Sequence, residues 1–165
     1  MTVRNNYTHT LYASYLGYVT QAIVNNFAPL LFLTFQRQMG VPLAQITLLV
    51  SVNFAVQLVV DALSARFVDK LGYRFWIVAG HVLAALGLAG LGILPHLTPA
   101  PFTGLLIAIV LYAIGGGLIE VLVSPIVEAC PTEKKEAAMS LLHSFYCWGH
   151  VFVVLATTAF FAVFG

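Results

Sequence analysis

Charged residues are scarce in this chain of 165 residues. Asp, Glu, Lys and Arg together make up 8% of the sequence, against about 25% in a typical soluble domain, whereas apolar residues make up 61%. This composition argues against a soluble domain and predicts a membrane protein, with the lipid bilayer as its surroundings. The formal net charge of +1 gives no information about nucleic acid, and we expect no nucleic-acid partner.

Cysteine is also rare: the chain contains only Cys130 and Cys147. These two residues have neither metal-ligand spacing nor a shared loop, so the sequence predicts no disulfide and no metal site. The common catalytic signatures, Gly-x-Ser-x-Gly, His-Glu-x-x-His and a pair of aspartates, are also missing. We therefore predict a protein that is not an enzyme and that needs no cofactor.

The sequence contains several long apolar segments. Each exceeds the roughly 20 residues that a helix needs to cross about 30 Å of hydrocarbon. Because backbone groups in lipid must bond within their own segment, these segments are predicted to be helices. The fold class is therefore an all-α membrane protein with a tail over residues 1–10 and five transmembrane helices near residues 11–36, 43–66, 75–95, 101–129 and 137–164. No polar tail follows the fifth helix, so we expect the chain to be truncated before a sixth.

The cations predict the orientation of these helices. Cytoplasmic loops carry an excess of Lys and Arg. Only Arg37 falls on one side of the predicted membrane. The other side, predicted to be cytoplasmic together with the amino terminus, carries Arg4, Arg66, Lys70, Arg74, Lys134 and Lys135.

The segment Gly115–Pro125 is costly for a transmembrane helix. It contains three consecutive glycines, one carboxylate at Glu120 and a proline within apolar surroundings. Each glycine costs about 1 kcal/mol relative to alanine, and an ionisable side chain at membrane depth is usually functional. Glu120 is thus a candidate for substrate binding and for proton coupling. In the structural alternative it pairs permanently with a partner such as His143, which helical rise places at a similar depth.

Further polar residues are predicted to lie within the first, second and fifth helices. Asn25 and Asn26 are adjacent, whereas Asn53, Gln57 and Asp61 follow one another at four-residue spacing and share one helix face. Two interpretations remain open: contact with a substrate in a water-filled cavity, or interhelical hydrogen bonds that only hold the bundle together. For Asp61 we favour a structural partnership with the nearby cationic loop. The candidate substrate-binding residues are Asn25, Asn26, Asn53, Gln57, Glu120 and His143.

The segment Phe67–Arg74 resembles the loop between helices 2 and 3 of the major facilitator superfamily. Asp69, Lys70, Gly72 and Arg74 match that family's pattern, whereas Ala65 and Tyr73 depart from it. The resemblance implies the amino-terminal part of a twelve-helix transporter, with an incomplete first half of six helices and the remaining carboxyl-terminal helices as its partner. It also implies that Asp69 and Arg74 act as a conformational latch during alternating access.

A narrower resemblance covers more of the chain. Val24–Asn26, the Gly117–Glu120 segment followed by Ser124 and Pro125, and Leu142–Tyr146 followed by Gly149 look like the fucose–galactose–glucose proton symporters, the fucose permease-like group. The resemblance implies that Glu120 lies near a sugar. Pro29 stands where that group carries a second acid, one that takes the coupled proton.

These observations favour a secondary active transporter of a small polar solute, such as a sugar, that works by alternating access, with a coupled proton as a candidate second partner. We expect a multi-pass protein of a bacterial plasma membrane. The alternatives are a small-molecule or drug exporter of the same superfamily, and a membrane fragment that does not transport. The many amides among the candidate residues favour a hydroxyl-rich ligand over an apolar drug.

Overall fold

The computed structural model describes residues 7–132 and 134–164, apart from the side chains of Ala65 and Asp69. This part of the chain forms the helices α1 (Tyr7–Leu30), α2 (Phe32–Met39), α3 (Leu43–Leu71), α4 (Tyr73–Leu97), α5 (Pro101–Ala129) and α6 (Lys135–Phe164). Five helical stretches are long and apolar enough to cross a membrane: Tyr7–Met39, Leu43–Ser64, Tyr73–Leu97, Pro101–Ala129 and Lys135–Phe164. The prediction of an all-α fold with five transmembrane helices is confirmed.

The first transmembrane segment is interrupted, which corrects the single helix predicted over residues 11–36. Pro29 lies inside α1 and has no N–H to donate to the Asn25 carbonyl, so the helical ladder weakens at this point. Leu31 then leaves the helix, with its amide bonded to the Ala28 carbonyl at 3.0 Å. The chain resumes as α2, and the segment crosses as two helices joined at one residue.

Other helices extend beyond their predicted ends. α1 includes residues 7–10, which were assigned to the tail. α3 continues to Leu71, and α4 begins at Tyr73, so Gly72 alone joins them. Gly72 has a φ of 81°, a left-handed conformation that glycine adopts without steric cost. The cationic connection is therefore a sharp corner between two helices rather than an extended loop.

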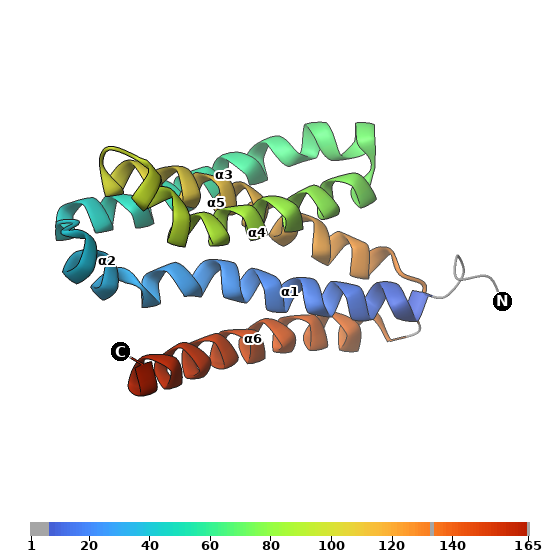
Figure 1. Ribbon diagram of the computed structural model, residues 1–165. Coiled ribbons are helices and arrows are strands. Elements are labelled where there is room, and N and C mark those ends of the chain that lie inside the picture. Colours follow the sequence, from blue (N-terminus) through green and yellow to red (C-terminus); the bar gives the residue numbers. More distant parts are fainter. Residues whose placement is uncertain (1–6, 133, 165) are drawn as a thin grey trace.

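The helices pack around α5. α4 and α3 both lie along α5, and α1 lies along α6 (Figure 1). α4 and α5 touch through glycines. A Cβ on Gly87 would overlap the backbone of Tyr112, and a Cβ on Gly104 would overlap the backbone of Leu94. Small residues allow this close approach between transmembrane helices, because no side chain separates the two backbones.

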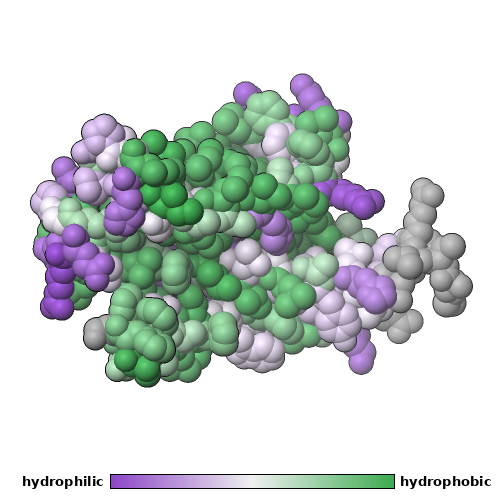
Figure 2. Space-filling model, in the orientation of Figure 1, coloured by the Kyte–Doolittle hydropathy of each residue, from purple (hydrophilic) through white to green (hydrophobic). Residues whose placement is uncertain are grey.

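The surface matches a membrane environment. Figure 2 shows a broad apolar belt over the helices, with hydrophilic residues gathered toward the two ends of the molecule. Large apolar side chains such as Leu58, Leu86, Phe152 and Leu155 are exposed on this protein. Exposed apolar area on this scale marks a surface that contacts lipid or other apolar surfaces.

Candidate functional site

Polar side chains from four helices meet inside the bundle. Gln57 of α3 donates a hydrogen bond through Nε2 to Asn25 Oδ1 of α1 at 2.8 Å. Asn25 in turn donates through Nδ2 to the Tyr146 hydroxyl of α6 at 3.4 Å. Gln21, one turn before Asn25, donates through Nε2 to Glu120 Oε2 of α5 at 2.9 Å. These five residues are called the polar cluster below.

The members of the polar cluster differ in burial. Gln21 is 0% exposed and Gln57 is 6% exposed, whereas Asn25 and Tyr146 are partly exposed and Glu120 is exposed. Glu120 therefore lies at the open edge of the cluster, with a buried amide behind it. Unpaired amides are costly in an apolar interior, which accounts for the chain of hydrogen bonds among them.

A second group of polar and aromatic side chains adjoins the cluster. The Tyr18 hydroxyl and Ser124 Oγ form a hydrogen bond of 3.0 Å between α1 and α5. The Tyr18 ring lies 5.6 Å from the His143 ring and 5.9 Å from the Tyr146 ring, measured between centroids. Tyr18 thus links the polar cluster to His143, and the site extends over α1, α3, α5 and α6.

The three consecutive glycines of α5 face different neighbours. A Cβ on Gly115 would overlap the Ala84 backbone of α4. A Cβ on Gly116 would lie 2.8 Å from Val24 Cγ1 of α1, 3.2 Å from Gln21 Oε1 and 3.3 Å from Gln57 Nε2. One on Gly117 would lie 3.1 Å from Val60 of α3. All three glycines thus permit close packing against α4, α1 and α3, and Gly116 also leaves room for the buried amides.

Comparison with known proteins gives the family. A family model described as Major Facilitator Superfamily matches residues 14–165, which is most of the chain. The chain belongs to the major facilitator superfamily. Neither a search of curated proteins nor a search of solved structures returned a match.

Membership of the major facilitator superfamily makes this chain an integral membrane protein of a transporter family, whose substrates are small molecules. The match supports the superfamily and does not support the narrower fucose permease-like group. The polar cluster is accordingly the candidate site of a transporter.

Two predicted site residues of this major facilitator protein lie apart from the hydrogen bonds of the cluster. Asn26 donates through Nδ2 to the Ala22 carbonyl of its own helix at 2.8 Å. Asn53 is 6% exposed, and its Oδ1 has no hydrogen-bond partner among the described residues. Asp61 Oδ1 is also buried without a partner in the described part of the chain.

The predicted partnership of Glu120 and His143 is not the one that the structure forms. Over residues 7–132 and 134–164, the hydrogen bond to Glu120 comes from Gln21. His143 is exposed and packs against Tyr18. The two side chains border the same site without sharing a hydrogen bond in the described part.

The predicted latch is described only in part. Arg74 is the second residue of α4 and is exposed, whereas the Asp69 side chain lies outside the described residues. The latch therefore stays a prediction.

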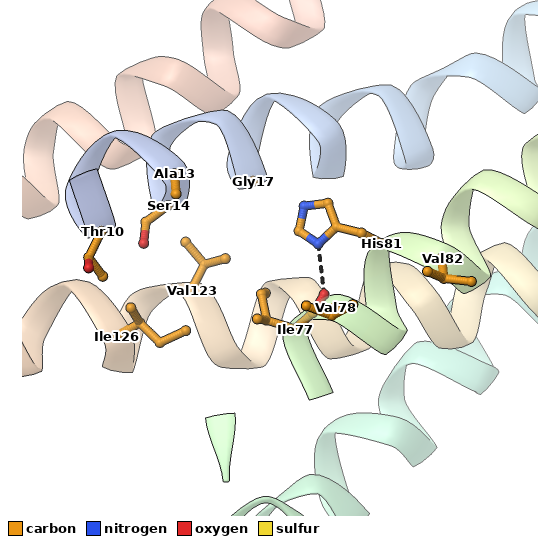
Figure 3. A pocket seen from close by; sticks show the side chains of 10 residues that line it. All are labelled: Thr10, Ala13, Ser14, Gly17, Ile77, Val78, His81, Val82, Val123 and Ile126. Carbon is orange, nitrogen blue, oxygen red and sulfur yellow. Dashed lines mark hydrogen bonds between the residues drawn. The ribbon is translucent and has the colours of Figure 1, made fainter. Parts of the chain in front are cut away.

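A separate cavity of about 370 Å³ lies between α1, α4 and α5 (Figure 3). It contains none of the predicted site residues, and its lining is mostly aliphatic. His81 points into it, with ring Nδ1 held at 2.8 Å from the Ile77 carbonyl of its own helix. A binding site for a polar solute needs several polar groups that contact the ligand, and this cavity offers few. The polar cluster is therefore the stronger candidate for a polar solute.

Sequence reasoning missed three residues that the structure adds to the site: Gln21, Tyr18 and Tyr146. Tyr18, Gln21 and Asn25 are spaced at i, i+3 and i+7, so they form one stripe along α1. This spacing was the available signal. Which helix the stripe faces depends on packing between distant segments, and the spacing alone does not determine it.

Proposed function

We propose that this protein functions as a secondary active transporter. It would move a small polar solute, with a sugar as the first candidate, by alternating access. The observation that carries the proposal is Glu120, which accepts a hydrogen bond from a fully buried glutamine inside a membrane-spanning bundle. A carboxylate within a transmembrane helix is expensive and marks a substrate or ion pathway by default.

The chemistry of the polar cluster suits hydroxyl groups. Asn25, Gln57, Tyr146 and Glu120 combine amide donors, amide acceptors, a hydroxyl and a carboxylate. Sugar hydroxyls both donate and accept, so they match such a mixed set. Asn26, Asn53 and His143 stay in the proposal as further substrate-binding residues, because they lie on α1, α3 and α6, which also carry members of the polar cluster.

The proposal includes a coupled proton carried by Glu120. Within residues 7–132 and 134–164, the hydrogen bond to Glu120 comes from a neutral amide rather than from a basic side chain. A carboxylate held by a neutral partner can gain or lose a proton without leaving a buried cation unpaired. The exposed side of Glu120 is where we expect the second wall of the site, supplied by further helices of the transporter.

Uptake measurements test the proposed function. Cells that express the gene encoding this chain are expected to accumulate one or more radiolabelled hexoses, and a proton ionophore is expected to abolish accumulation. Lipophilic cations serve as the comparison, because a drug exporter of the superfamily would lower their level in the cell. Export of the cations with no hexose uptake would favour the exporter, and neither activity would favour a membrane fragment that does not transport.

The orientation is a further part of the proposal, with the amino terminus and the connection after α5 in the cytoplasm. Ala100 and Lys134 are exposed at opposite ends of α5. In a variant with both native cysteines replaced by serine, Ala100→Cys is expected to react with an impermeant maleimide in intact cells. Lys134→Cys is expected to react only after permeabilisation. The reverse pattern would contradict the orientation.

A further inference from the structure

Gln21 is a buried polar side chain whose presence needs a physical reason. It is 0% exposed and lies on the α1 face that meets α5. An apolar side chain of the same size would fill this space without the cost of burying an amide. Buried amides are retained where they form a specific hydrogen bond, and for Gln21 that bond goes to Glu120.

The hydrogen bond between Gln21 and Glu120 uses only one polar atom of each side chain. Gln21 Nε2 lies 2.9 Å from Glu120 Oε2, whereas Gln21 Oε1 is buried with no partner among the described residues. Glu120 Oε1 likewise receives no hydrogen bond from the described part of the chain, and Glu120 is exposed. One carboxylate oxygen is therefore anchored and the other is free for a ligand.

The surroundings of Glu120 favour this arrangement. Among the described residues no Lys, Arg or His side chain pairs with Glu120, and the hydrogen bond to it comes from a neutral amide. An ionised carboxylate only accepts hydrogen bonds, so a donor is needed to fix its direction. Gln21 is that donor, and the missing side chain of Gly116 leaves space for its amide.

We propose that Gln21 is a positioning residue that holds Glu120 with its second oxygen directed toward the substrate. The expected effect on transport rests on the proposed function, because a misdirected Glu120 would bind the solute poorly. Hydrogen bonds to charged groups are stronger than those between neutral groups. Loss of the Gln21 amide is therefore expected to weaken hexose binding by about 10-fold or more.

The geometric part of the inference can be tested without transport. Infrared spectra of the purified protein contain carboxylate bands from all six acidic residues, and the difference between the wild type and Glu120→Gln identifies the Glu120 band. Gln21→Met removes the amide at nearly constant size and is expected to shift that band. Gln57→Met is the matched control, because it removes a buried amide that bonds to Asn25 instead, and it is expected to leave the band unchanged.

The possible outcomes separate the inference from the proposed function. An unchanged Glu120 band in Gln21→Met, or an equal shift in Gln57→Met, would overturn the positioning role. Gln21→Asn keeps an amide but shortens its reach, so it is expected to shift the band as well and replaces Gln21→Met if that variant does not fold. If the band shifts but the wild type takes up no hexose, Gln21 still positions Glu120 and the proposed function fails. If the band shifts and Glu120→Gln takes up hexose at the wild-type rate, Gln21 holds Glu120 but Glu120 does not bind the substrate, which overturns that part of the inference.

Discussion

Replacing Glu120 by glutamine is expected to reduce hexose uptake by about 100-fold, with protein levels unchanged. The charge-assisted hydrogen bonds that a carboxylate offers to hydroxyl groups are roughly twice as strong as those of a neutral amide. The neutral side chain also cannot release a proton, so coupled accumulation should stop. Because Glu120 is exposed at the edge of the cluster, the substitution leaves the packing of α5 intact.

Initial rates of hexose uptake into proteoliposomes measure this effect. Glu128→Gln provides the matched control, because Glu128 is an exposed carboxylate near the end of the same helix. The control is expected to transport at the wild-type rate. Unchanged uptake and affinity in Glu120→Gln would remove Glu120 from the mechanism and would leave it a structural role only.

Gly115→Ala is expected to destabilise the protein strongly, although it adds only one methyl group to α5. A Cβ at this position would overlap the backbone of Ala84, and a backbone cannot move aside as a flexible side chain can. The two helices would have to separate. Overpacking of this kind costs about 1–3 kcal/mol or more, which corresponds to a decrease in Tm of about 10 °C for a chain of this size.

Thermal unfolding of the purified protein in detergent measures the change in stability. Gly92→Ala in α4 is the matched control, because nothing lies within 4 Å of the Cβ that it adds. Alanine in a helix interior is favoured over glycine by about 1 kcal/mol, so the control is expected to be as stable as the wild type or slightly more stable. Equal Tm values for the two variants would show that α4 and α5 pack less closely than described.

Much of the fold could be predicted from the sequence, because the membrane constrains it strongly. The length of an apolar segment shows that it can cross the membrane. Because its backbone groups must bond within the segment in lipid, the segment must be a helix. Pro101 and Pro131 bracket the fourth predicted helix, and α5 ends at Ala129 as expected. The break at Leu31 escaped prediction although Pro29 signalled it, because transmembrane helices often continue through a proline when neighbours satisfy the freed carbonyl.

For the site, the sequence predicted several of the residues but not their contacts. Helical periodicity placed Gln57 on a polar stripe, the carboxylate at membrane depth singled out Glu120, and Asn25 was expected within the first helix. The sequence could not show that Asn26 bonds back to its own helix while Asn25 reaches across to α6. That difference depends on the rotation of α1 about its axis. Rotation is set by packing against α5 and α6, which lie about a hundred residues away in the chain.

The triplet Gly115–Gly117 also bears on how the protein moves. Successive residues of a helix point about 100° apart, so three glycines contact neighbours around more than half the circumference of α5 at one height. Turning α5 about its axis, or sliding it by one residue, would drive a branched side chain into one of these contacts. During the alternating access proposed above, α5 is therefore expected to keep its place against α1, α3 and α4. Glu120, one turn further along α5, would then stay at a fixed depth beside Gln21.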